Sequence, residues 1–208
     1  MQWFGEATMQ LIATGLRCER GGRTVFRNVS LSLKAGEMMQ LTGPNGSGKS
    51  SLLRLIAGLN ETVEGTLALD GGHGDLGIGQ QAHYIAHQEA VKAALTVAEN
   101  LSFWTKFLGG DGNVDTALAA FDLSRLAGFP AGLLSAGQKR RLALARLVLV
   151  PRALWLLDEP SVGLDTVSQQ RLAAVMDSQL AKGGMIIAAT HVPLGIAATK
   201  HLDLGPAA

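Results

Sequence analysis

The segment GPNGSGKS, residues 43–50, has the residue types and spacing of a loop that binds phosphate. It matches the pattern G-x-x-x-x-G-K-[ST], in which glycines let backbone N–H groups curl around a phosphate. Lys49 is predicted to reach the β- and γ-phosphates of a nucleotide, and the Ser50 hydroxyl to bind Mg²⁺. An apolar run before the loop and an amphipathic pattern after it argue against a chance match. The predicted nucleotide contacts are Gly43, Pro44, Asn45, Gly46, Ser47, Gly48, Lys49, Ser50 and Ser51.

A second chemical pattern is an apolar run that ends in two carboxylates, in the segment LWLLDE at residues 154–159. Acids at the carboxyl end of a buried parallel strand face the crevice in which ligands bind. Because neighbouring side chains of a strand point in different directions, Asp158 is predicted to hold Mg²⁺ while Glu159 polarises the attacking water as general base. Without the phosphate loop, the pair would fit better with a solvated strand end before a turn at Pro160.

These residues need strands and helices that hold them in place. Short unbroken apolar runs are typical of strands covered on both faces, as in a parallel sheet. Three such runs occupy residues 38–41, 154–157 and 185–189. Apolar spacing of three and four residues predicts helices over about 52–59 and 142–149. Thr96 and Glu99 form a capping-box pattern within residues 88–150, which look helical. The predicted fold class is therefore α/β, with a parallel-sheet core and an inserted helical subdomain.

Composition limits the classes of protein to consider. Apolar residues make up 47% of the 208 and charged residues 17%, which excludes disorder through excess charge. A net charge of +1 gives no bulk electrostatic argument for nucleic acid as a partner. The one cysteine, Cys18, cannot form a disulfide within the chain, which fits a reducing compartment such as the cytoplasm. The N-terminus lacks a signal-peptide pattern, and no uncharged apolar run reaches about 18 residues, so work at a membrane would need another chain that spans it.

The segment LSAGQ, residues 134–138, separates the classes of nucleotide-binding protein. Together with the phosphate loop and three further motifs, it resembles the ATP-binding cassette (ABC) family, in the family's order and over nearly the whole chain. The three further motifs are LLDEP at 156–160, GLD at 163–165 and TH at 190–191.

The resemblance implies a single domain. This would be a P-loop NTPase ABC cassette over residues 9–208, with a RecA-like core at about 9–87 and 151–208 and a helical subdomain at about 88–150. Residues 1–8 have no counterpart in the family. We expect them to be either a non-native start, with Met9 as the natural first residue, or a flexible tail.

The resemblance also implies that two copies enclose two ATP molecules. Ser135, Gly137 and Gln138 would face the γ-phosphate bound to the opposite subunit, and a helix N-terminus with a hydroxyl and a glycine amide suits an anion. Taken alone, LSAGQ would fit an ordinary helix cap equally well. Asp165 resembles the residue that communicates across the interface between the copies.

Three more residues receive roles from the resemblance. His191 matches the histidine that bonds the γ-phosphate and holds the base and the water, and Gln88 matches the glutamine that touches Mg²⁺ and the water. The plainer alternatives are a structural histidine and a polar loop glutamine. Arg20 stands where the family stacks an aromatic ring on adenine, and a guanidinium plane can also stack on a base. The other histidines show no metal spacing, so no direct ligation of haem or metal is predicted.

A narrower resemblance is to the haem-exporter ATP-binding subunits of bacterial cytochrome c maturation. It rests on CERGGRTVFRNVSL, HQEAVKAALTVAENLSFW, LSAGQKRRLALARL, LWLLDEP and THVPL. It implies that a homodimer binds ATP and Mg²⁺ and joins an integral membrane subunit at the cytoplasmic face of the inner membrane. ATP hydrolysis would then drive haem export or release of a haem-loaded chaperone. The alternatives are the ATPase of another small ABC transporter and a soluble ABC-type ATPase.

Two predictions concern the helical segment itself. Arg141 and Arg146 are predicted to lie on a solvated helix face. Phe103, Trp104 and Phe107 are predicted to pack inside the helical subdomain, with contact to a membrane partner as the alternative.

Overall fold

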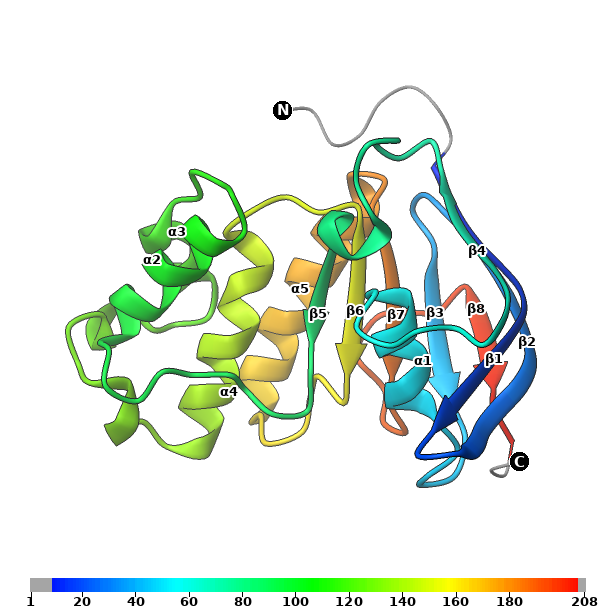
Figure 1. Cartoon of the computed structure of the whole chain (residues 1–208). Coiled ribbons are helices and arrows are strands. Elements are labelled where there is room, and N and C mark those ends of the chain that lie inside the picture. The colour runs from blue at the N-terminus through cyan, green and yellow to red at the C-terminus, as the bar shows by residue number, and fades with distance from the viewer. Residues whose placement is uncertain (1–8, 206–208) are drawn as a thin grey trace.

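The computed structural model describes residues 9–205, so the predictions for residues 1–8 lie outside the described residues. A five-stranded parallel sheet forms the centre of the molecule (Figure 1). Its strands, in spatial order, are β5 (Ala82–Ile85), β6 (Leu154–Asp158), β7 (Met185–Ala189), β3 (Met38–Thr42) and β8 (Lys200–Asp203). All three apolar runs are strands of this sheet, and β6 and β7 are buried along their whole length. The predicted parallel-sheet core is confirmed.

A second, antiparallel sheet of three strands lies along one side of the first, and the sequence analysis did not predict it (Figure 1). Its spatial order is β2 (Arg23–Lys34), β1 (Gln10–Arg20) and β4 (Glu64–Asp70). Alternate residues of β1 are buried, so one face of this sheet packs inward and the other meets solvent.

Helices cover both faces of the parallel sheet. Helix α1 (Lys49–Ile56) packs between the two sheets, where Leu52 and Ile56 are completely buried. On the opposite side, α5 (Thr166–Ala181) contacts β7, and α4 (Ala136–Ala145), α3 (Val114–Ala120) and α2 (Val97–Phe107) pack against one another farther from the sheet (Figure 1). Short 3-10 helices lie at Ile78–Gln81, Ser124–Leu126, Ala131–Leu133 and Arg146–Val148. No helix among the described residues is long and apolar enough to cross a bilayer.

Alternation along β6 divides the core into two layers. Trp155 and Leu157 belong to the cluster packed under α4 and α5, whereas Leu154 and Leu156 belong to the cluster around α1. Successive side chains of a strand point to opposite faces, which is why an unbroken apolar run is needed here. The sheet is thereby fixed from both sides, and the loops at its ends are held in place.

The capping box that starts the helical segment is confirmed. The Thr96 Oγ1 accepts a hydrogen bond from the Glu99 N–H at 3.2 Å, and a Glu99 carboxylate oxygen accepts one from the Thr96 N–H at 2.8 Å. These bonds satisfy two backbone donors at the start of α2. The hydrogen bond from the Thr96 backbone also lowers the pKa of Glu99. The division into a core and a subdomain over residues 88–150 stays a prediction.

The prediction of a solvated face for Arg141 and Arg146 is wrong. Arg146 is only 6% exposed, donates to the Ala143 carbonyl at 2.9 Å and lies 4.2 Å from the centre of the Trp104 ring. Arg141 donates to the carbonyl of Phe121 at 3.0 Å and joins α4 to the end of α3. Both side chains satisfy main-chain acceptors inside the helical part, which makes their long stems part of its packing.

The prediction that the aromatic residues of α2 pack inside is also wrong for two of the three. Phe103 is 36% exposed and Phe107 is 69% exposed, with their rings stacked on each other at 5.9 Å. Trp104 is partly buried against Arg146. The outward pair lies one turn apart on one face of α2, so the helix has an apolar stripe that residues 9–205 leave uncovered.

Candidate nucleotide site

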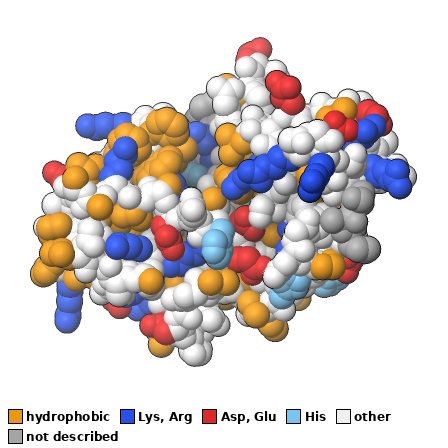
Figure 2. Space-filling view, turned by 60° about the horizontal axis from the view of Figure 1, so that its bottom comes forward, with side chains coloured by type: hydrophobic (Ala, Val, Ile, Leu, Met, Phe, Trp, Pro, Cys, Tyr) orange, Lys and Arg blue, Asp and Glu red, His pale blue; other side chains and the backbone are white. Residues whose placement is uncertain are grey.

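A cavity of about 510 Å³ opens at the carboxyl edge of the parallel sheet. It is formed by the loops after β3, β5 and β6, together with the end of β1, and a hollow with charged and histidine side chains is visible on this face (Figure 2). Its lining residues are Arg20, Val25, Asn45, Gly46, Gly48, Lys49, Ser50, Ser51, His87, Asp158 and Glu159. The structure thus brings the phosphate-loop residues and both predicted acids to one place.

The loop after β3 has a shape that only glycine tolerates. Gly43 has φ of +136° and Gly48 has φ of +98°, both in the left-handed half of conformational space. A Cβ at Gly43 would lie 2.7 Å from the Ser47 Oγ, and one at Gly48 would lie 2.7 Å from a Val25 methyl carbon. Gly48 is also the N-cap of α1, where no side chain caps the free N–H groups of the first turn. Those N–H groups and the helix dipole suit an anion.

Lys49 and Ser47 carry the polar side chains at the base of this loop. The Lys49 ammonium donates to the carbonyls of Gly43 at 2.6 Å and Pro44 at 3.0 Å, so it is held against the loop. The Ser47 Oγ is buried and has no hydrogen-bond partner among the described residues. A buried polar atom without a partner is costly unless a ligand satisfies it. The loop therefore fits a phosphate group.

Two carboxylates follow β6. Asp158 is 4% exposed at the end of the strand, and Glu159 follows with φ of +46°, which is unusual for a residue other than glycine. The Glu159 N–H donates to the Ala189 carbonyl of β7 at 2.8 Å. Ser50 lines the same cavity as both acids. Hydroxyl and carboxylate oxygens are ligands that Mg²⁺ prefers, so Ser50 and Asp158 fit that ion.

Gln88 and His191 do not line this cavity. Both residues are exposed, and His191 lines a separate cavity of about 220 Å³ beside Gln40 and Thr190. Their predicted contacts with Mg²⁺, water and the γ-phosphate stay predictions. His87 does line the main cavity, and the sequence analysis gave it no role. Its position just after β5 was the available signal, because loops at this edge carry the ligand contacts.

The LSAGQ segment lies on the surface at the start of α4. The Ser135 Oγ accepts from the Gln138 N–H at 3.3 Å, and the Gln138 Oε1 accepts from the Ser135 N–H at 2.8 Å. These bonds form a capping box. Within one chain, therefore, LSAGQ acts as an ordinary helix cap. The predicted contact of Ser135, Gly137 and Gln138 with a second subunit's nucleotide stays a prediction.

Asp165 is the N-cap of α5. Its Oδ1 accepts from the Ser168 N–H at 2.7 Å, and this hydrogen bond lowers the pKa of the Asp165 carboxyl. The turn before it packs against the start of α4, because a Cβ at Gly137 would lie 3.0 Å from the Gly163 carbonyl oxygen. The two segments with predicted roles at a subunit interface are therefore neighbours. The role of Asp165 across such an interface stays a prediction.

Comparison of the sequence with known proteins establishes the family. A model of the ABC transporter family matches residues 26–162. The cytochrome c biogenesis ATP-binding export protein CcmA of Nitrobacter winogradskyi is 53% identical over 201 residues, which cover 96% of this chain and 100% of that protein. This chain belongs to the ABC transporter family, among its CcmA proteins.

Solved structures agree with this assignment. One described as the ATP-binding subunit of an ABC transporter superposes with a TM-score of 0.77 at 26% identity, over 87% of this chain and 79% of that one. A putative ABC transporter ATP-binding protein from Pyrococcus furiosus gives a TM-score of 0.78 at 21% identity, over 94% of this chain and 97% of that one. The second likeness shows the fold alone. The predicted ABC cassette fold is confirmed.

Proposed function

We propose that this chain is the ATP-hydrolysing subunit of an ABC transporter for cytochrome c biogenesis, coupled to haem export or to release of a haem-loaded chaperone. The observation that carries the proposal is the 53% identity to a cytochrome c biogenesis ATP-binding export protein over that protein's whole length. The cavity supports it, because Lys49, Asp158 and Glu159 meet there.

The cavity residues divide the work of hydrolysis. The free N–H groups of the loop and Lys49 would bind the phosphates of ATP and offset their charge. Ser50 and Asp158 would hold Mg²⁺, which when bound neutralises charge on the phosphate oxygens. Glu159 would orient a water molecule and accept its proton as it attacks the γ-phosphorus. Arg20, exposed at the end of β1 and lining the cavity, would stack on the adenine.

A second copy of the chain would complete this site. Outside the phosphate loop, six residues with proposed roles are at least partly exposed and do not line the cavity. They are Gln88, Ser135, Gly137, Gln138, Asp165 and His191. In a head-to-tail dimer, the start of α4 in each copy, residues 135–138, would close the cavity of the other copy. Symmetric pairing of this kind uses the same surface twice. Glu159 of each copy would then act when the other copy closes on the ATP in its cavity.

The transporter would also need an integral membrane subunit, with this chain bound peripherally at its cytoplasmic face. The exposed pair Phe103 and Phe107 on α2 supports a contact there, because an uncovered aromatic stripe favours a protein partner. Lys92 lies 4.4 Å above the Phe103 ring and adds a positive charge to this surface. No nucleic acid is proposed as a partner, and no haem ligand in this chain.

Deleting the gene in its native host and staining c-type cytochromes for haem tests the proposal. We expect holocytochromes to disappear, to return with the unsubstituted gene, and to stay absent with Lys49→Ala. Normal holocytochrome levels in the deletion strain would reject the cytochrome role. ATP turnover by the purified chain would still test the ATPase assignment separately.

A further inference from the structure

One buried arginine connects the LSAGQ helix to the segment that carries the proposed general base. Arg140 is 2% exposed and lies in the second turn of α4. All its hydrogen bonds to the described residues go to main-chain carbonyls. Its acceptors are the oxygens of Ala86 at 2.8 Å, His87 at 3.5 Å, Asp158 at 3.0 Å, Glu159 at 2.6 Å and Pro160 at 3.2 Å.

These hydrogen bonds matter because Glu159 has an unusual backbone conformation. A residue other than glycine held at positive φ costs on the order of 1–3 kcal/mol and persists only where its surroundings fix it. Glu159 has φ of +46°. Its N–H donates to the Ala189 carbonyl at 2.8 Å, and its own carbonyl accepts from the Arg140 guanidinium at 2.6 Å and, more weakly, from the Val162 N–H at 3.3 Å. The Arg140 bond is the shorter of the two and comes from a charged donor, so it contributes most to fixing the direction in which the carboxylate leaves the backbone.

The same guanidinium reaches the loop that follows β5. It donates to the carbonyls of Ala86 and His87, and the His87 side chain lines the nucleotide cavity. Hydrogen bonds from a charged donor are about twice as strong as neutral ones. A planar group with five N–H donors can join α4 to two separate loops, which a lysine ammonium with three donors on a flexible stem cannot reproduce.

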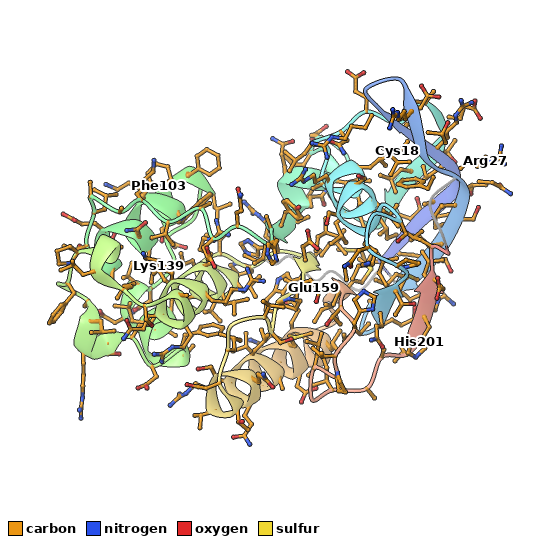
Figure 3. All side chains as sticks on the ribbon, turned by 90° about the horizontal axis from the view of Figure 1, so that it is seen from below. Cys18, Arg27, Phe103, Lys139, Glu159 and His201 are labelled. Carbon is orange, nitrogen blue, oxygen red and sulfur yellow. The ribbon has the colours of Figure 1, made fainter. Side chains whose placement is uncertain are left out.

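We propose that Arg140 is a positioning residue for ATP hydrolysis, which fixes the backbone of Glu159 so that its carboxylate points at the attacking water. The labelled Glu159 lies between the helical part and the sheets, where α4 meets the end of β6 (Figure 3). The proposal rests on the proposed ATPase function and adds a residue that acts through Glu159 without touching the nucleotide.

Arg140→Lys keeps the charge and removes the fork of donors. We expect its kcat for ATP to fall by about 100-fold, the usual cost of displacing a catalytic group by about 1 Å, while KM for ATP is unchanged. In a Glu159→Gln background, we expect Arg140→Lys to cause no further loss in single-turnover hydrolysis, because the group it positions is already disabled.

Arg146→Lys is the matched control. Arg146 is also buried and also donates to a main-chain carbonyl, but within the described part of the chain it makes no hydrogen bond or ion pair with Glu159 or the loop after β5. We expect it to lower Tm and leave kcat unchanged. An unchanged kcat in Arg140→Lys would overturn the proposal, and so would an equal loss with and without Glu159, or an equal loss in Arg146→Lys. If the proposed function itself failed, the unsubstituted chain would show no ATP turnover, and this proposal would fall with it.

Discussion

Two regions with proposed roles in one reaction are built in opposite ways. The cavity side, residues 43–51 with Asp158 and Glu159, gathers its groups within one chain. The tip side, from Ser135 to Gln138 with Asp165, lies on the surface, and its polar groups are satisfied by capping bonds. The buried Ser47 hydroxyl on the cavity side has no hydrogen-bond partner in the described part of the chain, whereas the tip side is complete as a helix cap. The difference indicates that one chain gathers the residues predicted to bind the nucleotide but only half of the proposed catalytic site.

Lys49→Ala disables the cavity side and has the largest expected effect. Removing the charge that offsets the phosphates is expected to lower ATP turnover at least about 1,000-fold. Steady-state phosphate release measures it. The control is Lys182→Ala, because Lys182 is exposed at the end of α5 and outside the cavity lining. Unchanged turnover in Lys49→Ala would remove the assignment of residues 43–50 to phosphate binding.

Glu159→Gln separates binding from hydrolysis on the same side. The amide keeps the shape of the carboxylate but cannot take a proton from water, so turnover is expected to fall by about 100-fold or more. ATP should then remain bound and hold two copies together, which light scattering after size exclusion measures with ATP present. Glu61→Gln, at an exposed residue outside the cavity lining, should change neither quantity. A Glu159→Gln protein that stays monomeric in saturating ATP would contradict the shared site.

Mixing two inactive variants tests whether the tip side acts on the other copy. Ser135→Arg places a bulky charge on the tip and leaves its own cavity intact, whereas Lys49→Ala does the reverse. A mixed dimer contains one intact cavity facing one intact tip, so an equal mixture is expected to recover up to about one quarter of normal turnover. Turnover of the mixture is compared with that of each variant alone.

The control for this mixing experiment is Lys49→Ala with Glu159→Gln, in which both faults lie on the cavity side. No recovery is expected there, because every cavity in the mixture is damaged. Recovery in the control would show that the tip of one copy does not need to act on the cavity of the other. The same conclusion would follow if the Ser135→Arg mixture showed no recovery although both proteins were folded.

Much of the cavity side could be predicted from the sequence because its signals are local. The apolar run of β6 ends directly at Asp158 and Glu159, and β3 ends a few residues before Asn45, so strand, turn and cavity residues are close together along the chain. The same locality explains the Thr96 and Glu99 cap of α2, in which both partners lie within one turn.

The rest depends on contacts between distant segments. Strand β1 pairs with β2 and β4 through register shifts, and its alternating pattern has no unbroken apolar run to reveal it. Three basic residues follow LSAGQ, and nothing local shows that Arg140 turns inward. Its acceptors are carbonyls at the ends of β5 and β6, up to 54 residues away. Phe103 and Phe107 are apolar residues in a helix, yet only tertiary packing shows that their face is uncovered.

The smallest expected effect concerns His83, which belongs to neither the cavity side nor the tip side. Its titration separates the pH dependence of stability from the pH dependence of ATP turnover. His83 is buried in β5, where its Nε2 lies 2.7 Å from the Val150 carbonyl oxygen. Burial, aided by the charges of Arg152 and Arg146, lowers the pKa of His83 from 6.5 to about 4. Between these values the unfolded chain binds a proton that the folded chain does not, so stability is full above pH 6.5 and falls as the pH drops towards 4.

At pH 5, this difference corresponds to a loss of about 2 kcal/mol in the free energy of unfolding. Urea unfolding at pH 7.5 and pH 5 measures it, and His83→Gln should give a smaller loss because an amide can still donate to Val150 but does not titrate. His201→Gln, at an exposed histidine in β8, should keep the full loss. If His83→Gln and the unsubstituted chain lost equal stability, acid sensitivity would arise elsewhere. A smaller loss in His83→Gln would identify His83 as a source of the acid sensitivity of folding. Turnover of the His83→Gln protein at pH 5 would then report on the groups of the cavity and the tip.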